Sequence, residues 1–358
     1  MEAAVETMET RFEPPAEGTA LEQYAPGEKP WVTHRRQTQK MCELLDIQDP
    51  RIQALRARME GCSSTLIFAH TLPEDAHGRT FKLHEANFCR VRVCPVCQWR
   101  RSLRLCARFQ EAIPALEAEI PGHRWILLTL TVKNVPVESL RESLQKLNVG
   151  WKRLSQTKRF RAAVLGYVKN IEVTRSATGE AHPHIHALLL VAGEYFQSAQ
   201  YIPQSEFREM WRAAMRLGYD PQVNVQAVPK ANSIAAAREI LKYATKPEDL
   251  LTDQKWTVEY IRQVHGLRFL ATGGVVRQLF SEQEPDEEEM LLTGQEQEQE
   301  DEPGTGEVLA LSRWNWKVEE KGYYCAGVRW RASGHTGAPP ARGGEKRAGQ
   351  EQKALERA

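Results

Sequence analysis

Three cysteines lie within nine residues, as Cys89, Cys94 and Cys97. This crowding constrains the local fold, because three thiolates in a Cys-x4-Cys-Pro-x-Cys pattern suit a Zn²⁺ knuckle better than three unrelated buried thiols. The chain has seven cysteines among 358 residues, which is too few for a disulfide framework. The sequence therefore predicts a metal-binding knuckle, with Cys62, His84 and Cys106 as candidates for its fourth ligand.

Charge is segregated along the chain, although the formal net charge is only +1. The formal net charge is −5 for residues 1–34 and −12 for residues 281–307. It is +13 for residues 35–280 and +5 for residues 308–358. A basic body between acidic segments is typical of a nucleic-acid-binding protein, although a basic solvated surface gives the same balance.

Composition divides the chain into five parts. The Pro- and Gly-rich acidic start predicts a disordered leader, and the Gln/Glu run near residue 300 predicts a second disordered stretch. The expected divisions are a leader at 1–34, a helical and Cys-rich module at 35–119, a second folded module at 120–280, an acidic linker at 281–307, and a small aromatic segment with a basic tail at 308–358.

No apolar run is long enough for a membrane span, and the acidic start lacks the apolar segment of a signal peptide. We therefore expect a cytoplasmic protein with no membrane partner.

The second module has a readable order of elements. Apolar periodicity predicts strands at 125–132, 164–174, 184–191 and 222–228, and helices at 137–156, 203–217 and 232–246. The order β-α-β-β-α-β-α predicts an α+β fold in which two split βαβ units form a ferredoxin-like antiparallel sheet.

The stretch His182-Pro-His184-Ile-His186 is the most informative motif. Residues two apart on a strand face the same side, so His184 and His186 converge. Glu172, on the preceding predicted strand, can complete a three-ligand metal site across a hairpin. The alternative is a pair of surface histidines without a ligand.

A second motif runs from Glu239 through Lys242 and Tyr243 to Lys246. Glu239 and Tyr243 are four residues apart and share one face of a helix. Two lysines beside a tyrosine can stabilise a phenolate and hold a phosphate. The alternative is an ordinary amphipathic helix.

Together these motifs resemble the HUH endonuclease superfamily and, within it, the replication initiator (Rep) proteins of rolling-circle plasmids. The resemblance covers about residues 60–280. It includes Phe88–Arg101, Leu127–Thr131, Glu172–Thr174, His182–His186 and Glu239–Lys246.

The resemblance implies a role for each site residue. His184, His186 and Glu172 would bind Mg²⁺ or Mn²⁺, which polarises the scissile phosphate. Tyr243, aided by Lys242 and Lys246, would attack that phosphate, and Glu239 would later activate the water that ends a replication round.

The resemblance also favours Cys62 as the fourth zinc ligand, because relatives carry a further cysteine there. Arginines near the knuckle would grip the DNA backbone; they are Arg90, Arg92, Arg100, Arg101 and Arg104. The implied partners are plasmid origin DNA, single-stranded at the nick, and a host helicase and DNA polymerase.

Two other functions fit parts of this pattern. A single-strand HUH transposase shares the motifs, but such enzymes often pair two tyrosines where this chain has Glu239 and Tyr243. A zinc-dependent DNA-binding regulator, with structural histidines, would form no covalent adduct with DNA.

Overall fold

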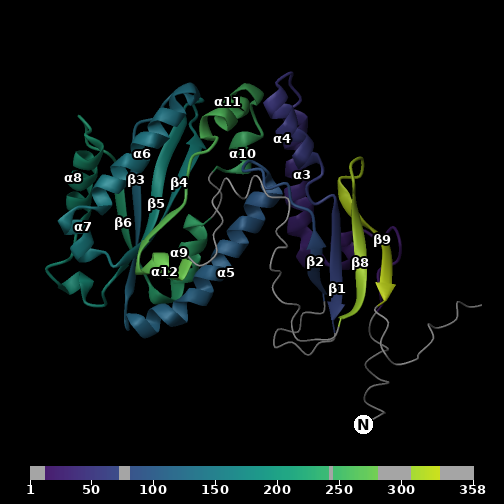
Figure 1. Ribbon diagram of the computed structural model, residues 1–358, viewed down its shortest axis with the longest axis horizontal. Helices are drawn as coiled ribbons and strands as arrows, with labels where there is room; N and C mark the ends of the chain where they lie inside the picture. The colour runs from purple at the N-terminus through teal and green to yellow at the C-terminus, as the bar shows by residue number, and fades with distance from the viewer. Residues whose placement is uncertain (1–12, 72–80, 242–244, 281–307, 331–358) are drawn as a thin grey trace, which may run out of the picture.

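The computed structural model describes residues 13–71, 81–241, 245–280 and 308–330. In this part of the chain, two antiparallel sheets stand side by side and helices cover them, which makes the fold α+β, as the sequence predicted (Figure 1). The predicted linker at 281–307 and the tail beyond residue 330 lie outside the described residues.

The larger sheet contains five strands in the spatial order β6-β3-β5-β4-β7, and each neighbouring pair is antiparallel. The strands are β3 (Arg124–Thr131), β4 (Gly166–Arg175), β5 (Ala181–Val191), β6 (Val223–Val228) and β7 (Ala271–Gly274). The first four agree with the four predicted strands. Their spatial order places the fourth beside the first, then the third and the second.

Helices cover both faces of this sheet, because apolar residues of β4 and β5 alternate between two buried sides. Ile171, Ile185 and Leu189 belong to the core formed with α6 (Leu140–Ser155), α8 (Gln204–Met215) and α11 (Gln254–Val264). Leu188 and Leu190 pack instead with α5 (Pro95–Glu119), α9 (Ser233–Ile240) and α12 (Val275–Phe280). Two short helices, α7 (Lys158–Ala163) and α10 (Pro247–Leu250), complete this part.

Helix α9 is shorter than the predicted helix at 232–246. It ends at Ile240, since Leu241 already leaves helical geometry at φ −84° and ψ 6°. Lys246 is extended, with ψ 134°, because the following Pro247 disfavours a helical conformation at the residue before it.

The smaller sheet has the order β2-β1-β8-β9. Its strands are β1 (Thr65–Thr71), β2 (Phe81–Ala86), β8 (Val308–Lys317) and β9 (Gly322–Trp330). The predicted aromatic segment forms a hairpin of β8 and β9, which pairs with β1 and so shares a sheet with the Cys-rich module. Sequence alone divided these segments into separate parts because pairing partners so far apart leave no local signal.

The N-terminal helices are α2 (Leu21–Tyr24), α3 (Lys29–Leu44) and α4 (Pro50–Glu60). Helices α2 and α3 pack against this smaller sheet, and α4 packs against α3. The prediction of a disordered leader at 1–34 is therefore wrong for residues 13–34, whereas residues 1–12 lie outside the described part. Leu21, Trp31 and Val32 are buried, and this apolar contact outweighs the turn-forming prolines and glycines around them.

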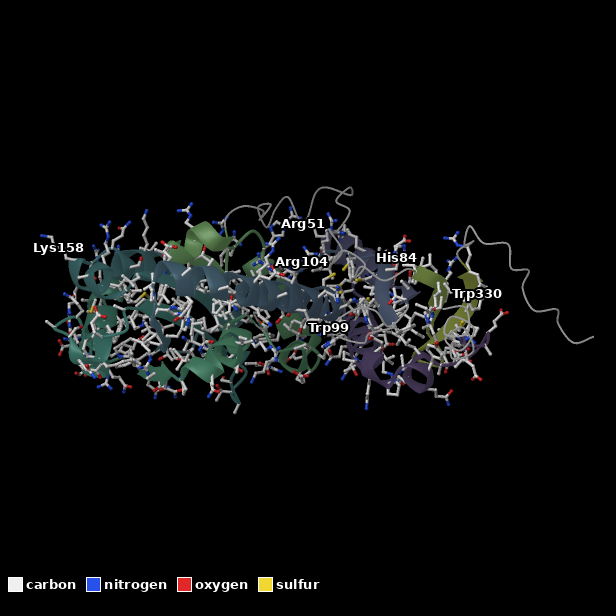
Figure 2. The ribbon with its side chains drawn as sticks, turned by 90° about the horizontal axis from the view of Figure 1, so that it is seen from below. Arg51, His84, Trp99, Arg104, Lys158 and Trp330 are labelled. Atoms are coloured by element: carbon white, nitrogen blue, oxygen red, sulfur yellow. The ribbon has the colours of Figure 1, made fainter. Side chains whose placement is uncertain are left out.

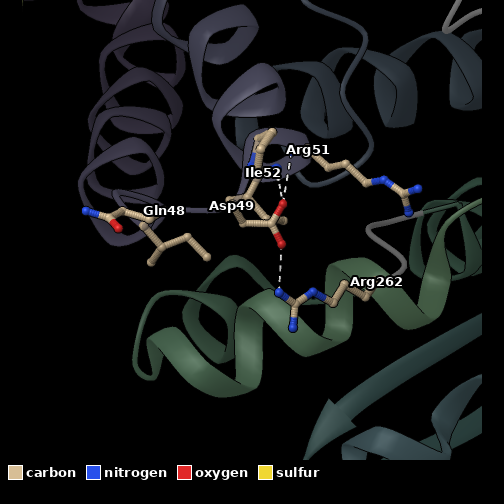
Figure 3. Close-up of a pocket in the computed structure, with 7 residues that line it drawn as sticks. Gln48, Asp49, Arg51, Ile52 and Arg262 are labelled. Atoms are coloured by element: carbon tan, nitrogen blue, oxygen red, sulfur yellow. Dashed lines mark hydrogen bonds and ion pairs between the residues drawn. The ribbon is translucent and has the colours of Figure 1, made fainter.

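The part with the smaller sheet contacts the part with the larger sheet where Asp49, at the start of α4, meets Arg262 of α11. Asp49 caps α4 by accepting hydrogen bonds from the backbone N–H groups of Arg51 and Ile52, and its other oxygen lies 2.7 Å from Arg262 of α11 (Figure 3). These groups line a surface hollow with Ile47, Gln48 and Pro50. The Asp49 carboxylate thus caps α4 and also forms an ion pair between the two parts of the protein.

None of the described helices is both long enough and apolar enough to cross a lipid bilayer.

Candidate functional site

Glu172, His184 and His186 form one compact group on the larger sheet. Glu172 on β4 lies directly opposite His184 on β5 in the antiparallel register. The Oε2 atom of Glu172 lies 3.4 Å from Nε2 of His184 and 3.2 Å from Nε2 of His186. The sequence could not fix this register, and the structure brings the three predicted ligands together.

The other nitrogen of each imidazole has its own partner. Nδ1 of His184 lies 3.1 Å from the carbonyl oxygen of His182, and Nδ1 of His186 lies 3.1 Å from the hydroxyl of Thr129 on β3. Such contacts orient a ring and leave Nε2 for a metal ion. Two Nε2 atoms and a carboxylate oxygen, all within 4.8 Å of one another, therefore fit a divalent cation.

The pKa of Glu172 also suits the binding of a divalent cation. Partial burial tends to raise its pKa, but hydrogen bonds and charge from His184 and His186 hold the pKa of Glu172 well below its usual range. The carboxylate therefore stays ionised at neutral pH. His182 is outside this group, and its Nδ1 lies 2.6 Å from Asn134 Oδ1.

The end of α9 is fixed to the same region of the sheet. Asn170, which pairs with His186 in the register, donates its side-chain amide to the carbonyl of Ile240 at 2.9 Å. Leu241 and Thr245 are both buried. Tyr243 and Lys242, the predicted nucleophile and its neighbour, lie outside the described residues.

Glu239 and Lys246 lie on either side of that segment, and both are exposed. Glu239 is on α9, and neither residue belongs to the Glu172 group. Another tyrosine, Tyr260, is fully buried, accepts a hydrogen bond from Thr245 at 2.6 Å, and has its pKa raised to about 12 by that burial. Tyr260 is therefore a poor nucleophile in this structure.

The four cysteines Cys62, Cys89, Cys94 and Cys97 form a second group. Cys62 follows α4, Cys89 follows β2, and the other two begin α5. The Cys62 sulfur lies 3.6 Å from the sulfurs of Cys94 and Cys97, and the Cys89 sulfur lies 3.5 Å from that of Cys97. Tetrahedral zinc, with bonds of about 2.3 Å, separates its sulfurs by about 3.8 Å, so the thiols fit Zn²⁺.

Cys62 is thus the fourth member of the group, and His84 and Cys106 are not members. Burial alone would raise the pKa of Cys94, but hydrogen bonds from Cys62, Cys89 and Cys97 hold that pKa well below its usual value. The lowered pKa favours the thiolate, the form that binds metals. All seven cysteines are free of disulfides.

The predicted DNA-binding arginines have different surroundings. Arg104 is exposed on α5, and Trp99 lies on the same helix (Figure 2). The guanidinium of Arg100 lies 5.3 Å from the ring centre of Trp31. Arg92 instead donates to the carbonyl of Val264 at 3.2 Å, which is an internal contact.

The partners of the histidine rings were not found from the sequence. Thr129 faces His186 because β3 and β5 pair in register, and Asn170 reaches α9 across the sheet. Alternation along each strand shows which residues share a face, but only strand pairing shows which of them meet.

Comparisons with known proteins agree with the motifs. The replication protein family matches residues 80–324. A "Protein rep" of Lentilactobacillus hilgardii is 32% identical over 264 residues, covering 70% of this chain and 82% of that protein. A "Protein rep" of Bacillus amyloliquefaciens is 29% identical over 314 residues, covering 80% and 91%.

A third relative, a "Protein rep" of Streptococcus pneumoniae, is 31% identical over 233 residues and covers 63% of this chain and 71% of its own length. No solved structure matches the chain. The family match includes both cysteine-rich and histidine-rich motifs, and it extends into the β8–β9 hairpin. The chain therefore belongs to the replication protein (Rep) family, as its sequence motifs predicted.

Proposed function

We propose that this protein is the initiator of rolling-circle plasmid replication, a nuclease that nicks one DNA strand at the origin and later rejoins it. The observation that carries the proposal is the Glu172 carboxylate, which faces the Nε2 atoms of both His184 and His186. This metal-binding geometry occurs in a member of the replication protein family.

The proposed fold is the ferredoxin-like sheet of HUH endonucleases. Support comes from strand order, since β6, β3, β5 and β4 stand in the arrangement fourth, first, third, second. The histidine pair lies on the third of these strands, β5.

The proposed nicking reaction is an in-line displacement. A bound Mg²⁺ or Mn²⁺ supplies Lewis-acid polarisation of the scissile phosphate. The Tyr243 oxygen forms a bond to phosphorus, and the bond from phosphorus to the 3′ oxygen breaks. The leaving oxygen takes a proton and becomes the 3′-OH primer, while the 5′ phosphate stays on Tyr243. Lys242 and Lys246 would stabilise the phenolate and the phosphate.

The proposal is tested with single-stranded oligonucleotides from the DNA beside the gene. With Mn²⁺, the wild-type protein should cut one of them once and become linked to the 5′ phosphate of the fragment downstream of the nick. The adduct should survive denaturing electrophoresis and disappear after nuclease digestion. Absence of any adduct across the replicon would favour a regulator without nuclease activity.

The cysteine group is proposed to hold Zn²⁺ and to support the DNA-binding surface of α5. Arg100, Arg101 and Arg104 lie on the first turns of this helix, and Arg90 precedes it. Contacts from these arginines to phosphates would position the DNA without reading its sequence. A host helicase and a DNA polymerase would act on the nicked product.

Replacing Cys62 with serine should lower the zinc content from about one ion per chain to nearly none. A serine hydroxyl is a poor ligand for Zn²⁺, and the remaining three thiols close only part of the coordination shell. Metal analysis of protein purified without chelator measures the effect. Cys106→Ser is the matched control and should keep its zinc; retained zinc in Cys62→Ser would show that the ion is held without this thiol.

Replacing Glu239 with glutamine should leave nicking nearly normal but slow termination by about 10²–10⁴-fold, the usual effect of losing a positioned general base. In nicking the nucleophile is the Tyr243 phenolate acting on a metal-polarised phosphate, whereas termination needs an activated water. The measurement is the accumulation of multimeric single strands and long-lived adducts in a replication assay. Glu248→Gln is the control, and a normal termination rate in Glu239→Gln would transfer the role to Glu248 or Asp249.

A further inference from the structure

The loop between Cys89 and Cys94 is held in shape by the cysteine group. The backbone N–H of Val91 lies 3.5 Å from the Cys89 sulfur, and the N–H of Cys94 donates to the Val91 carbonyl at 3.0 Å. The carbonyl of Arg92 accepts a hydrogen bond from the Gln98 side chain at 2.6 Å. These contacts therefore fix the backbone at Arg92, from which its side chain extends.

The Arg92 side chain points away from this loop toward the larger sheet. Its guanidinium donates to the carbonyl of Val264, the last residue of α11, and lies 4.9 Å from the ring centre of Phe269. Val264 and Phe269 are both buried. Arg92 thus contacts the start and the end of the short connection from α11 to β7.

That connection supports β4 at the residue before Glu172. Strand β7 pairs with β4 only as far as Lys169, opposite Ala271. Beyond this pair, the N–H of Ile171 donates to the carbonyl of Phe269 at 3.2 Å. Without that hydrogen bond, the side of β4 away from β5 would have no backbone partner next to Glu172. The carboxylate of Glu172 must nevertheless stay in place to face two imidazoles.

We propose that Arg92 is a positioning residue which couples the cysteine group to the Glu172, His184 and His186 site through Phe269. It acts through the backbone of β4 and holds the Glu172 carboxylate at the distance that a divalent cation requires. This inference rests on the proposed function of that site as a metal centre. This role is proposed in place of the sequence-based prediction that Arg92 contacts the DNA backbone.

The test compares Arg92→Met and Arg92→Lys with a control at the same loop. Methionine keeps the apolar stem but removes the donors and the charge, whereas lysine keeps one donor and the charge. Arg58→Gln is the control, because Arg58 donates to the Cys89 carbonyl at 2.6 Å from the exposed side of α4. It loosens the loop without touching the connection to β7.

Titration of zinc-loaded protein with Mn²⁺, followed by calorimetry, measures affinity at the Glu172 site without DNA. Arg92→Met should bind Mn²⁺ about tenfold more weakly, the lower end of the effect of outer residues on metal affinity. Its zinc content and its KM for single-stranded DNA should stay within about twofold of wild type, while kcat falls. Arg92→Lys should recover part of the Mn²⁺ affinity, and Arg58→Gln should match wild type.

Several results would overturn the inference. Normal Mn²⁺ affinity with a raised KM in Arg92→Met would make Arg92 a DNA ligand, and loss of zinc would limit its role to the cysteine group. An equal loss of Mn²⁺ affinity in Arg58→Gln would mean that any loosening of the loop between Cys89 and Cys94 weakens Mn²⁺ binding. If the wild-type protein binds no Mn²⁺ at all, the proposed metal centre itself fails, and the coupling fails with it.

Discussion

Replacing Tyr243 with phenylalanine is expected to abolish nicking while leaving DNA binding within about twofold of wild type. The change removes only the oxygen that would attack phosphorus, and losing a nucleophile typically lowers the rate by about 10⁴-fold or more. The measurement is the yield of covalent adduct on a 5′- and 3′-labelled single-stranded oligonucleotide, together with a gel-shift assay of binding.

Tyr260→Phe is the matched control for this change. Its hydroxyl lies in the core and contacts Thr245, so removing it should affect stability more than nicking. If Tyr243→Phe still forms an adduct, the nucleophile lies elsewhere. Tyr219, whose hydroxyl accepts a hydrogen bond from the backbone N–H of Lys133, would then be the next residue to replace.

Replacing His184 or His186 with alanine is expected to reduce cleavage below detection, and EDTA should do the same to the wild-type protein. Each change removes one of three ligands and leaves the Glu172 carboxylate facing a single imidazole. Because two ligands are imidazoles, Mn²⁺ should support cleavage at least as well as Mg²⁺. The measurement is the initial rate of oligonucleotide cleavage at saturating metal.

His182→Ala is the control, because His182 lies on the same strand but outside the ligand group. The carbonyl that it offers to His184 belongs to the backbone and survives the change. EDTA can also remove zinc. Recovery of activity when Mn²⁺ alone is added back would show that the loss came from the Glu172, His184 and His186 site and not from the cysteine group. Full cleavage in the presence of the chelator would rule out the metal centre.

Sequence reasoning succeeded where the signal is local. The alternation of His184 and His186, and the apolar strands on either side, defined the ligand-bearing sheet before its register was known. The thiol group was predicted from the spacing of three cysteines, whereas Cys62 came from the family resemblance. In the structure Cys62 meets the others because α4 ends beside the start of α5.

Sequence reasoning failed where distant segments decide the outcome. Residues 13–34 have a leader-like composition, yet the N–H of Cys325 donates to the carbonyl of Thr19, and Trp31 is buried and packs edge-to-face with Trp99. The sequence predicted a DNA contact for Arg92 from its charge and its place beside the cysteines. It gave no sign that Arg92 also contacts Val264 and Phe269, which belong to another module.

The pairing of β1 with β8 has a consequence for the order in which the protein matures on the ribosome. The larger sheet is complete once Gly274 has been synthesised, but β1 gains its second neighbour only after Lys317. The segment made first therefore finishes folding last. A fragment cut after residue 280, which would keep every predicted catalytic residue, would leave the backbone of β1 exposed along one side and prone to pair with other chains. Expression of the proposed nuclease part should therefore keep the β8–β9 hairpin.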